Sequence, residues 1–149
     1  MRRKQEPFEP FQSGYDKTAN RIIIKTKLMD LNKYTNLNRT NQYAGASVKK
    51  KLTDYIMAEC LSQRLKLDLD RSATYDLKIY WIVPDKRKDA DNVYSQVKFM
   101  LDGIVKANII DGDGRKSIRN ITNYIRTVKG KEFVIVRLHA LQHKNNQSR

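Results

Sequence analysis

Acidic residues and one lysine recur at helical spacing in one segment of the chain. Asp91, Lys98 and Asp102 follow one another at intervals of seven and four residues. At about 100° per residue, these intervals place all three on one narrow face of a helix. Asp89 lies just before this helix, and Asp113 follows it in the Gly-rich sequence DGDG. If that loop folds back beside the start of the helix, the carboxylates of Asp89, Asp91 and Asp113 converge.

Three carboxylates in one place repel one another and require a cation. Asp89, Asp91 and Asp113 offer hard oxygen ligands without His or Cys, and such ligands favour Mg²⁺ or Mn²⁺. A Mg²⁺ ion held by carboxylates in a basic protein is the chemistry of phosphodiester hydrolysis, because the metal activates water and neutralises charge on the phosphate. Lys98 would supply a point charge to the same phosphate.

The same residues also have simpler interpretations. Asp91 is suited to cap the helix, and Asp89 to lie in its first turn, where the helix dipole favours acids. Lys98 and Asp102 are suited to an exposed ion pair worth about a few tenths of a kcal/mol. DGDG is typical of a tight turn. Spacing alone leaves the metal site and these interpretations open.

Other motifs do not fit. DGDGRKSIRNIT has Lys116 where a calcium-binding EF-hand loop requires Gly, and Thr122 where it requires Glu. GDGRKS lacks the spacing of a nucleotide-binding phosphate loop. His139 and His143 lie at the end of a predicted strand and in the tail, which does not favour a metal site.

The acidic segment follows a predicted strand and opens a predicted helix. Residues 75–83 alternate in polarity, with Lys78 and Tyr80 on the face opposite the apolar residues Leu77, Ile79, Trp81 and Val83. A helix is expected over 92–107, and Asn108 suits its end. A second helix is expected to begin at Ser47 as its N-cap, with a buried stripe formed by Val48, Leu52, Ile56 and Cys60. Cys60 is expected to be a packed thiol.

The remaining periodicity completes the predicted fold. Strands are expected over 21–27, 117–128 and 132–141, with 28–46 irregular and with the last two strands paired as a hairpin through the turn 129–131. The order β-α-β-α-β-β favours an α/β (α+β) fold: a single small domain in which two main helices pack on a mixed sheet. We expect a flexible N-terminal arm over 1–20, the folded domain over 21–141 and a disordered basic tail over 142–149.

The charge balance indicates a polyanionic partner. The 149 residues include 30 Lys and Arg and 16 Asp and Glu, a net charge of +14, and such an excess on a small domain favours nucleic acid. Residues in three basic clusters are expected to contact DNA: Lys49, Lys50, Lys51, Lys86, Arg87, Lys88, Arg115 and Lys116. No apolar run is long enough to span a bilayer, the N-terminus has no apolar signal region, and Cys60 has no disulfide partner. The sequence therefore predicts a cytoplasmic protein.

The acidic segment KDADNVYSQVKFMLDGIVKANIIDGDG resembles that of the RusA family of Holliday-junction resolvases, small endonucleases often carried by phages. The shared pattern is D-x-D-N, a Lys, an Asp four residues later, and a further Asp after the helix. The likeness extends over about residues 20–141 and includes a basic segment before the first helix. Two features depart from the family: seven residues separate Asp91 from Lys98, and Asp111-Gly112-Asp113 stands where two adjacent acids are usual.

The resemblance implies roles for individual residues. Asp89, Asp91 and Asp113 correspond to the metal-binding acids, with Asp111 in reserve as the third ligand, and Lys98 to the catalytic lysine. Asp102 and Asn92 would support the site. The implied activity is Mg²⁺-dependent, or Mn²⁺-dependent, cleavage of four-way DNA junctions by a homodimer in recombination and repair, in the host cytoplasm if phage-encoded, with no small-molecule cofactor. A non-catalytic basic module that binds nucleic acid is the alternative, since the charge fits both.

Overall fold

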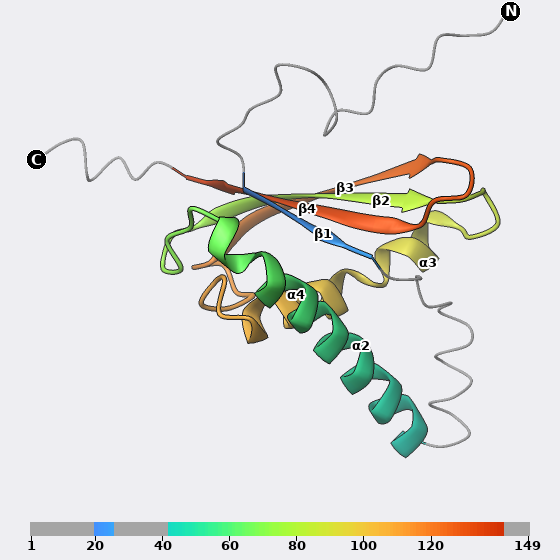
Figure 1. Ribbon diagram of the computed structural model, residues 1–149, viewed down its shortest axis with the longest axis horizontal. Helices are drawn as coiled ribbons and strands as arrows, with labels where there is room; N and C mark the ends of the chain where they lie inside the picture. The colour runs from blue at the N-terminus through green and yellow to red at the C-terminus, as the bar shows by residue number, and fades with distance from the viewer. Residues whose placement is uncertain (1–19, 26–41, 142–149) are drawn as a thin grey trace, which may run out of the picture.

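Helices α2 (Gln42–Gln63) and α4 (Val97–Lys106) lie on one face of a four-stranded sheet in the computed structural model, which describes residues 20–25 and 42–141 (Figure 1). This is the small mixed α/β domain that the sequence predicts. The other elements are β1 (Asn20–Ile24), the 3₁₀ turn η2 (Arg64–Lys66), β2 (Tyr75–Val83), α3 (Ala90–Tyr94), β3 (Ile118–Thr127) and β4 (Phe133–Ala140). The predicted tail and all of the predicted arm except Asn20, which begins β1, lie outside the described residues.

The sheet order β1-β4-β2-β3 differs from the predicted hairpin. β3 pairs with β2 in parallel, whereas β4 pairs antiparallel with both β1 and β2. The strands β3 and β4 are therefore not neighbours, because β2 lies between them. Strand composition fits this order, because β4 (FVIVRLHA) is mostly apolar and lies inside the sheet, whereas β3 (IRNITNYIRT) is mostly polar and lies at its edge.

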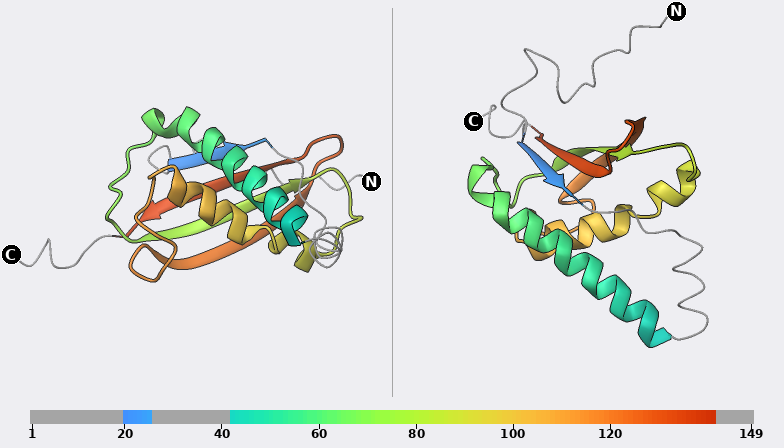
Figure 2. Two further views of the ribbon diagram at one scale, coloured as in Figure 1. Left: turned by 90° about the horizontal axis from the view of Figure 1, so that it is seen from below. Right: turned by 45° about the vertical axis from the view of Figure 1, so that its right-hand side comes forward.

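The core lies between the helices and the face of the sheet that they cover (Figure 2). Leu77, Ile79 and Trp81 of β2 are buried on this face, as the alternation predicts, and pack with Ile104 of α4. Tyr80, on the opposite face, is also fully buried, in a second cluster with Ile82 and Ile135. The strand is thus buried on both faces over its second half, which is typical of a central strand.

Helix α2 begins at Gln42, five residues before the predicted N-cap, so Ser47 lies within the helix and caps nothing. The predicted buried stripe is confirmed at Ile56 and Cys60, both of which have no exposed surface. Burial raises the pKa of the Cys60 thiol to about 12, which keeps it protonated and unreactive at neutral pH. In residues 20–25 and 42–141 no helix is both long enough and apolar enough to cross a membrane.

The predicted helix over 92–107 is divided into α3 and α4 at Ser95 and Gln96. The Ser95 hydroxyl donates to the carbonyl of Asn92 at 2.6 Å, and the Gln96 N–H bonds three residues back, to Val93. Both bonds tighten the chain relative to an α-helix, as serine side chains that bond to the backbone commonly do. A single helical wheel therefore does not hold across the break, although it holds for Lys98 and Asp102 within α4.

Candidate active site

Lys98, in the first turn of α4, contacts two carboxylates. Its Nζ lies 3.1 Å from Asp102 Oδ1, one turn further along the helix, and 2.6 Å from Asp113 Oδ2. Asp113 belongs to the loop between α4 and β3. The loop therefore folds back along α4 to the first turn of that helix. The sequence set a different condition, that the loop reach the start of the predicted helix, which is now α3.

The contact shifts the acidity of both partners. The hydrogen bond from Lys98 lowers the pKa of the Asp113 carboxyl, and the bonds to Asp113 and then Asp102 raise the pKa of the Lys98 ammonium. Both groups are therefore charged at neutral pH. Their side chains are 59% and 41% exposed, so solvent screens the pair, and a ligand from solution can reach either group.

Two contacts fix the loop that carries Asp113. Asp111 pairs with Arg71 through Oδ1 and Nε at 2.8 Å and donates its N–H to the Arg71 carbonyl. The N–H of Gly112 donates to the buried Ser117 hydroxyl at 3.1 Å. Asp111 thus faces Arg71, whereas Asp113 faces Lys98.

Asp89 and Asp91 are exposed at the start of α3. Asp89, and not Asp91, occupies the N-cap position, but its side chain makes no capping hydrogen bond, and Asp91 lies in the first turn. Neither carboxylate forms an ion pair within the part of the chain that the structure describes. Capping therefore does not account for the two acids.

Carboxylates such as those of Asp89, Asp91 and Asp113 are the ligands that a hard cation prefers, but these three do not lie together as a metal site. Among residues 20–25 and 42–141, no three Asp, Glu, His or Cys side chains make a group that could hold a metal ion. Asp89 and Asp91 are thus not gathered with Asp113 into a ligand set. Asp113 instead contacts the ammonium group of Lys98.

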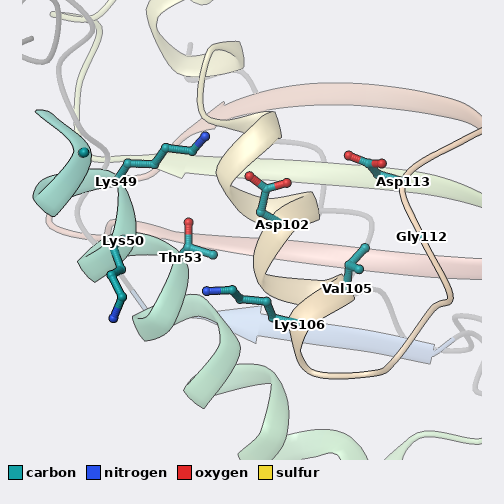
Figure 3. A pocket seen from close by; sticks show the side chains of 9 residues that line it. Lys49, Lys50, Thr53, Asp102, Val105, Lys106, Gly112 and Asp113 are labelled. Carbon is teal, nitrogen blue, oxygen red and sulfur yellow. The ribbon is translucent and has the colours of Figure 1, made fainter. Parts of the chain in front are cut away.

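The predicted DNA-binding residues fall in different places. Lys49 and Lys50 of α2 line a groove that also contains Asp102 and Asp113 (Figure 3). The side chain of Lys51 is exposed outside the groove lining. The other basic residues lie in two loops, one after β2 and one before β3: Lys86, Arg87 and Lys88 in the first, and Arg115 and Lys116 in the second.

Four residues near the acids were not predicted from the sequence. Thr53 and Lys106 line the groove, and Arg71 and Ser117 hold the loop. Two of them have a signal in the spacing, since Thr53 lies four residues after Lys49 and Lys106 four residues after Asp102, on the same helix faces. Arg71 and Ser117 act through tertiary contacts, which leave no such pattern.

Neither the models of known protein families nor the curated protein sequences give a match to this chain.

Proposed function

We propose that the protein is a Mg²⁺-dependent, structure-selective endonuclease of the RusA type that cuts four-way DNA junctions. The observation that carries the proposal is the contact of Lys98 with Asp113. It joins residues 15 positions apart in the sequence at one exposed point, and these are a cation and an acid that the proposed chemistry requires. The net charge of +14 supports a polyanionic substrate.

In this proposal Asp89, Asp91 and Asp113, which are not gathered into one group in this structure, would have to draw together to hold the metal ion, for which Mn²⁺ is an alternative. When bound, such an ion activates water and neutralises charge on the phosphate. Lys98 is exposed enough to turn from Asp113 to a phosphate oxygen, where it would supply a positive charge. Asp102 remains one turn away and orients the lysine from the other side.

A non-catalytic nucleic-acid-binding module is the second candidate. Lys98 neutralises Asp102 and Asp113 together, as a structural ion-pair network also would. In that case the pairs hold the loop in place, and the basic loops bind phosphates without cutting them.

Cleavage of labelled DNA distinguishes the candidates. A four-way junction and the matching linear duplex are incubated with the protein in Mg²⁺ or in EDTA, alongside Asp91→Asn. We expect paired nicks in the junction only, dependent on Mg²⁺ and absent from the variant. The variant retains junction binding, because it loses a negative charge that faces phosphate. Tight binding without cleavage in any divalent metal would establish the binding module instead.

A further inference from the structure

A groove between α2 and α4 opens beside the candidate active site (Figure 3). It has a volume of about 480 Å³. One wall is a single face of α2, whose residues recur at intervals of three and four, and the other wall is the face of α4 that carries Asp102 and Lys106. The loop residues Gly112 and Asp113 close one end. The groove is thus continuous with the Lys98–Asp113 contact.

The groove and its ion-pair partners carry one unmatched positive charge. Asp54 contacts both Lys50 and Lys106, at 3.2 and 3.3 Å, and Lys98 contacts Asp102 and Asp113. With Lys49 included, these are four lysines and three aspartates. Lys49 is the lysine that makes no ion pair with any described residue. Figure 3 shows its side chain extending across the groove towards α4.

Thr53 adds a neutral donor to the same space. Its side chain is aimed into the groove (Figure 3) and the residue is only 5% exposed. Its hydroxyl makes no hydrogen bond with another residue in the described part of the chain. The hydroxyl is not among the fully buried atoms of the described residues, so it is open to the groove and can donate to a ligand there.

We propose that Lys49, Thr53 and Lys106 form a subsite for one backbone phosphate of the nucleic acid, adjacent to the phosphate that Lys98 would contact. A phosphodiester carries one negative charge and several acceptor oxygens, which match one unpaired ammonium, one hydroxyl and the shared ammonium of Lys106. The subsite rests on the proposed function for its substrate. It assigns Lys49 a role that Lys51, two residues away, does not have.

The test compares Lys49→Met with the matched control Lys51→Met. Each variant removes one charge from the same helix at an exposed position, so effects of net charge are equal. Binding of a labelled four-way junction is measured in EDTA between about 50 and about 200 mM salt. We expect Lys49→Met to weaken binding about tenfold and to reduce the slope of log K against log salt by about 0.9, the value for one lost phosphate contact. Lys51 is also a predicted DNA contact but lies outside the groove, so we expect Lys51→Met to weaken binding clearly less than Lys49→Met. Equal losses in the two variants would overturn the subsite.

A second measurement locates the phosphate. Single methylphosphonate linkages, which carry no charge, replace the phosphates near the branch point one at a time. We expect one linkage at which the uncharged replacement weakens binding by the wild-type protein. At that same linkage the replacement should barely weaken binding by Lys49→Met or Thr53→Val, because these variants already lack the contact. If both variants lose as much as the wild type at every linkage, the subsite is wrong.

These results are independent of cleavage. Failure of the nuclease proposal appears as an uncut junction with wild-type protein in Mg²⁺. Failure of the subsite appears in the binding measurements, which are the comparison of Lys49→Met with Lys51→Met in EDTA and the methylphosphonate series.

Discussion

Lys98 takes part in two interactions of different origin. Its pairing with Asp102 is local, because residues four apart on a helix face one another. Its pairing with Asp113 is tertiary and depends on the loop that Arg71 and Ser117 hold against the rest of the domain. The stronger hydrogen bond is the tertiary one, at 2.6 Å against 3.1 Å. The position of the loop therefore determines which of the two carboxylates Lys98 bonds more closely.

Removing the ammonium of Lys98 tests its role in the proposed reaction. We expect Lys98→Met to return the pKa of Asp113 upward towards its ordinary value, because the hydrogen bond that lowers it is lost. We also expect junction cleavage to slow by about 100-fold or more, as is typical when one charged donor to a reacting phosphate is lost, while Mn²⁺ binding persists. Carboxyl NMR titration, single-turnover cleavage and calorimetry measure the three effects. An unchanged cleavage rate would remove Lys98 from the mechanism.

A second pair of opposite charges, between the neighbouring strands β2 and β3, links stability to pH. Arg119 of β3 donates to both oxygens of Asp76 in β2, at 3.2 and 2.7 Å, and lowers the pKa of Asp76. A lowered pKa stabilises the fold above the unfolded value of about 3.9 and ceases to do so as pH falls through the folded value. We therefore expect Arg119→Gln to be less stable than wild type at pH 7, and the difference to shrink below about pH 4. Urea unfolding at both pH values measures this, and a difference independent of pH would contradict it.

At the scale of elements, the approach of α2 to α4 depends on Gly103. A Cβ atom at this position would lie 2.4 Å from Ile56 Cγ2 and 2.7 Å from Ile56 Cβ. Cβ is attached to the helix backbone, so Ile56 cannot relieve the overlap by rotating its side chain. The two helices must separate if position 103 bears any side chain, and their separation would widen the groove between Lys49 and Asp102.

We expect Gly103→Ala to destabilise the protein by about 1–3 kcal/mol through overpacking, although alanine favours a helix by about 1 kcal/mol. The control is Gly114→Ala, whose added Cβ meets nothing within 4 Å and whose effect should stay within about 0.5 kcal/mol. Urea midpoints of both variants, of Ile56→Ala and of Gly103→Ala/Ile56→Ala measure the effect. A loss in the double variant smaller than the sum of the losses in Gly103→Ala and Ile56→Ala supports the overlap, and equal stability of Gly103→Ala and Gly114→Ala would exclude it.

Local rules predict the elements whose signals lie within a few residues. Asn108 has φ 58° after α4, with its N–H bonded to Val105 and that of Ile109 to Ile104, which is the Schellman helix end that asparagine favours. The limits of β2 also follow from alternation and Pro84. The start of α2 could not be predicted, because a capping residue at position 47 also fits within a helix. The break at Ser95 depends on a single side-chain bond that competes with the helix.

The order of the strands needed information from the whole sheet. A Lys-Gly-Lys turn between β3 and β4 favours a hairpin locally, and Gly130 does have the positive φ of a tight turn. The observed pairing departs from that preference, because the apolar strand β2 lies between β3 and β4 and bonds to both. The polarity of β3 is the sequence feature that points to the edge. Asp113 lies beside Lys98 because the chain crosses from β2 through α4 to the parallel strand β3. From the sequence, the return of this loop towards the helix could be stated only as a condition.

At the scale of the whole molecule, the proposed reaction requires two active sites. A four-way junction has two equivalent strands to cut, and a two-fold dimer presents two identical sites to them. We therefore propose that the protein acts as a homodimer, which the resemblance to RusA resolvases also implies. Each chain contributes a net charge of +14, so in this proposal the phosphates of the junction would hold two chains together despite their mutual repulsion.

The number of cuts per binding event tests the dimer. A supercoiled plasmid that extrudes a cruciform becomes linear when both strands are cut before the protein leaves, because cutting one strand alone releases the supercoil and the cruciform is reabsorbed. We expect wild-type protein in Mg²⁺ to convert this plasmid directly to the linear form. Mixtures of wild type with excess Asp91→Asn should accumulate nicked circles, since mixed dimers hold one working site. Nicked circles from wild-type protein alone, with one chain bound per junction by light scattering, would show that the sites act singly.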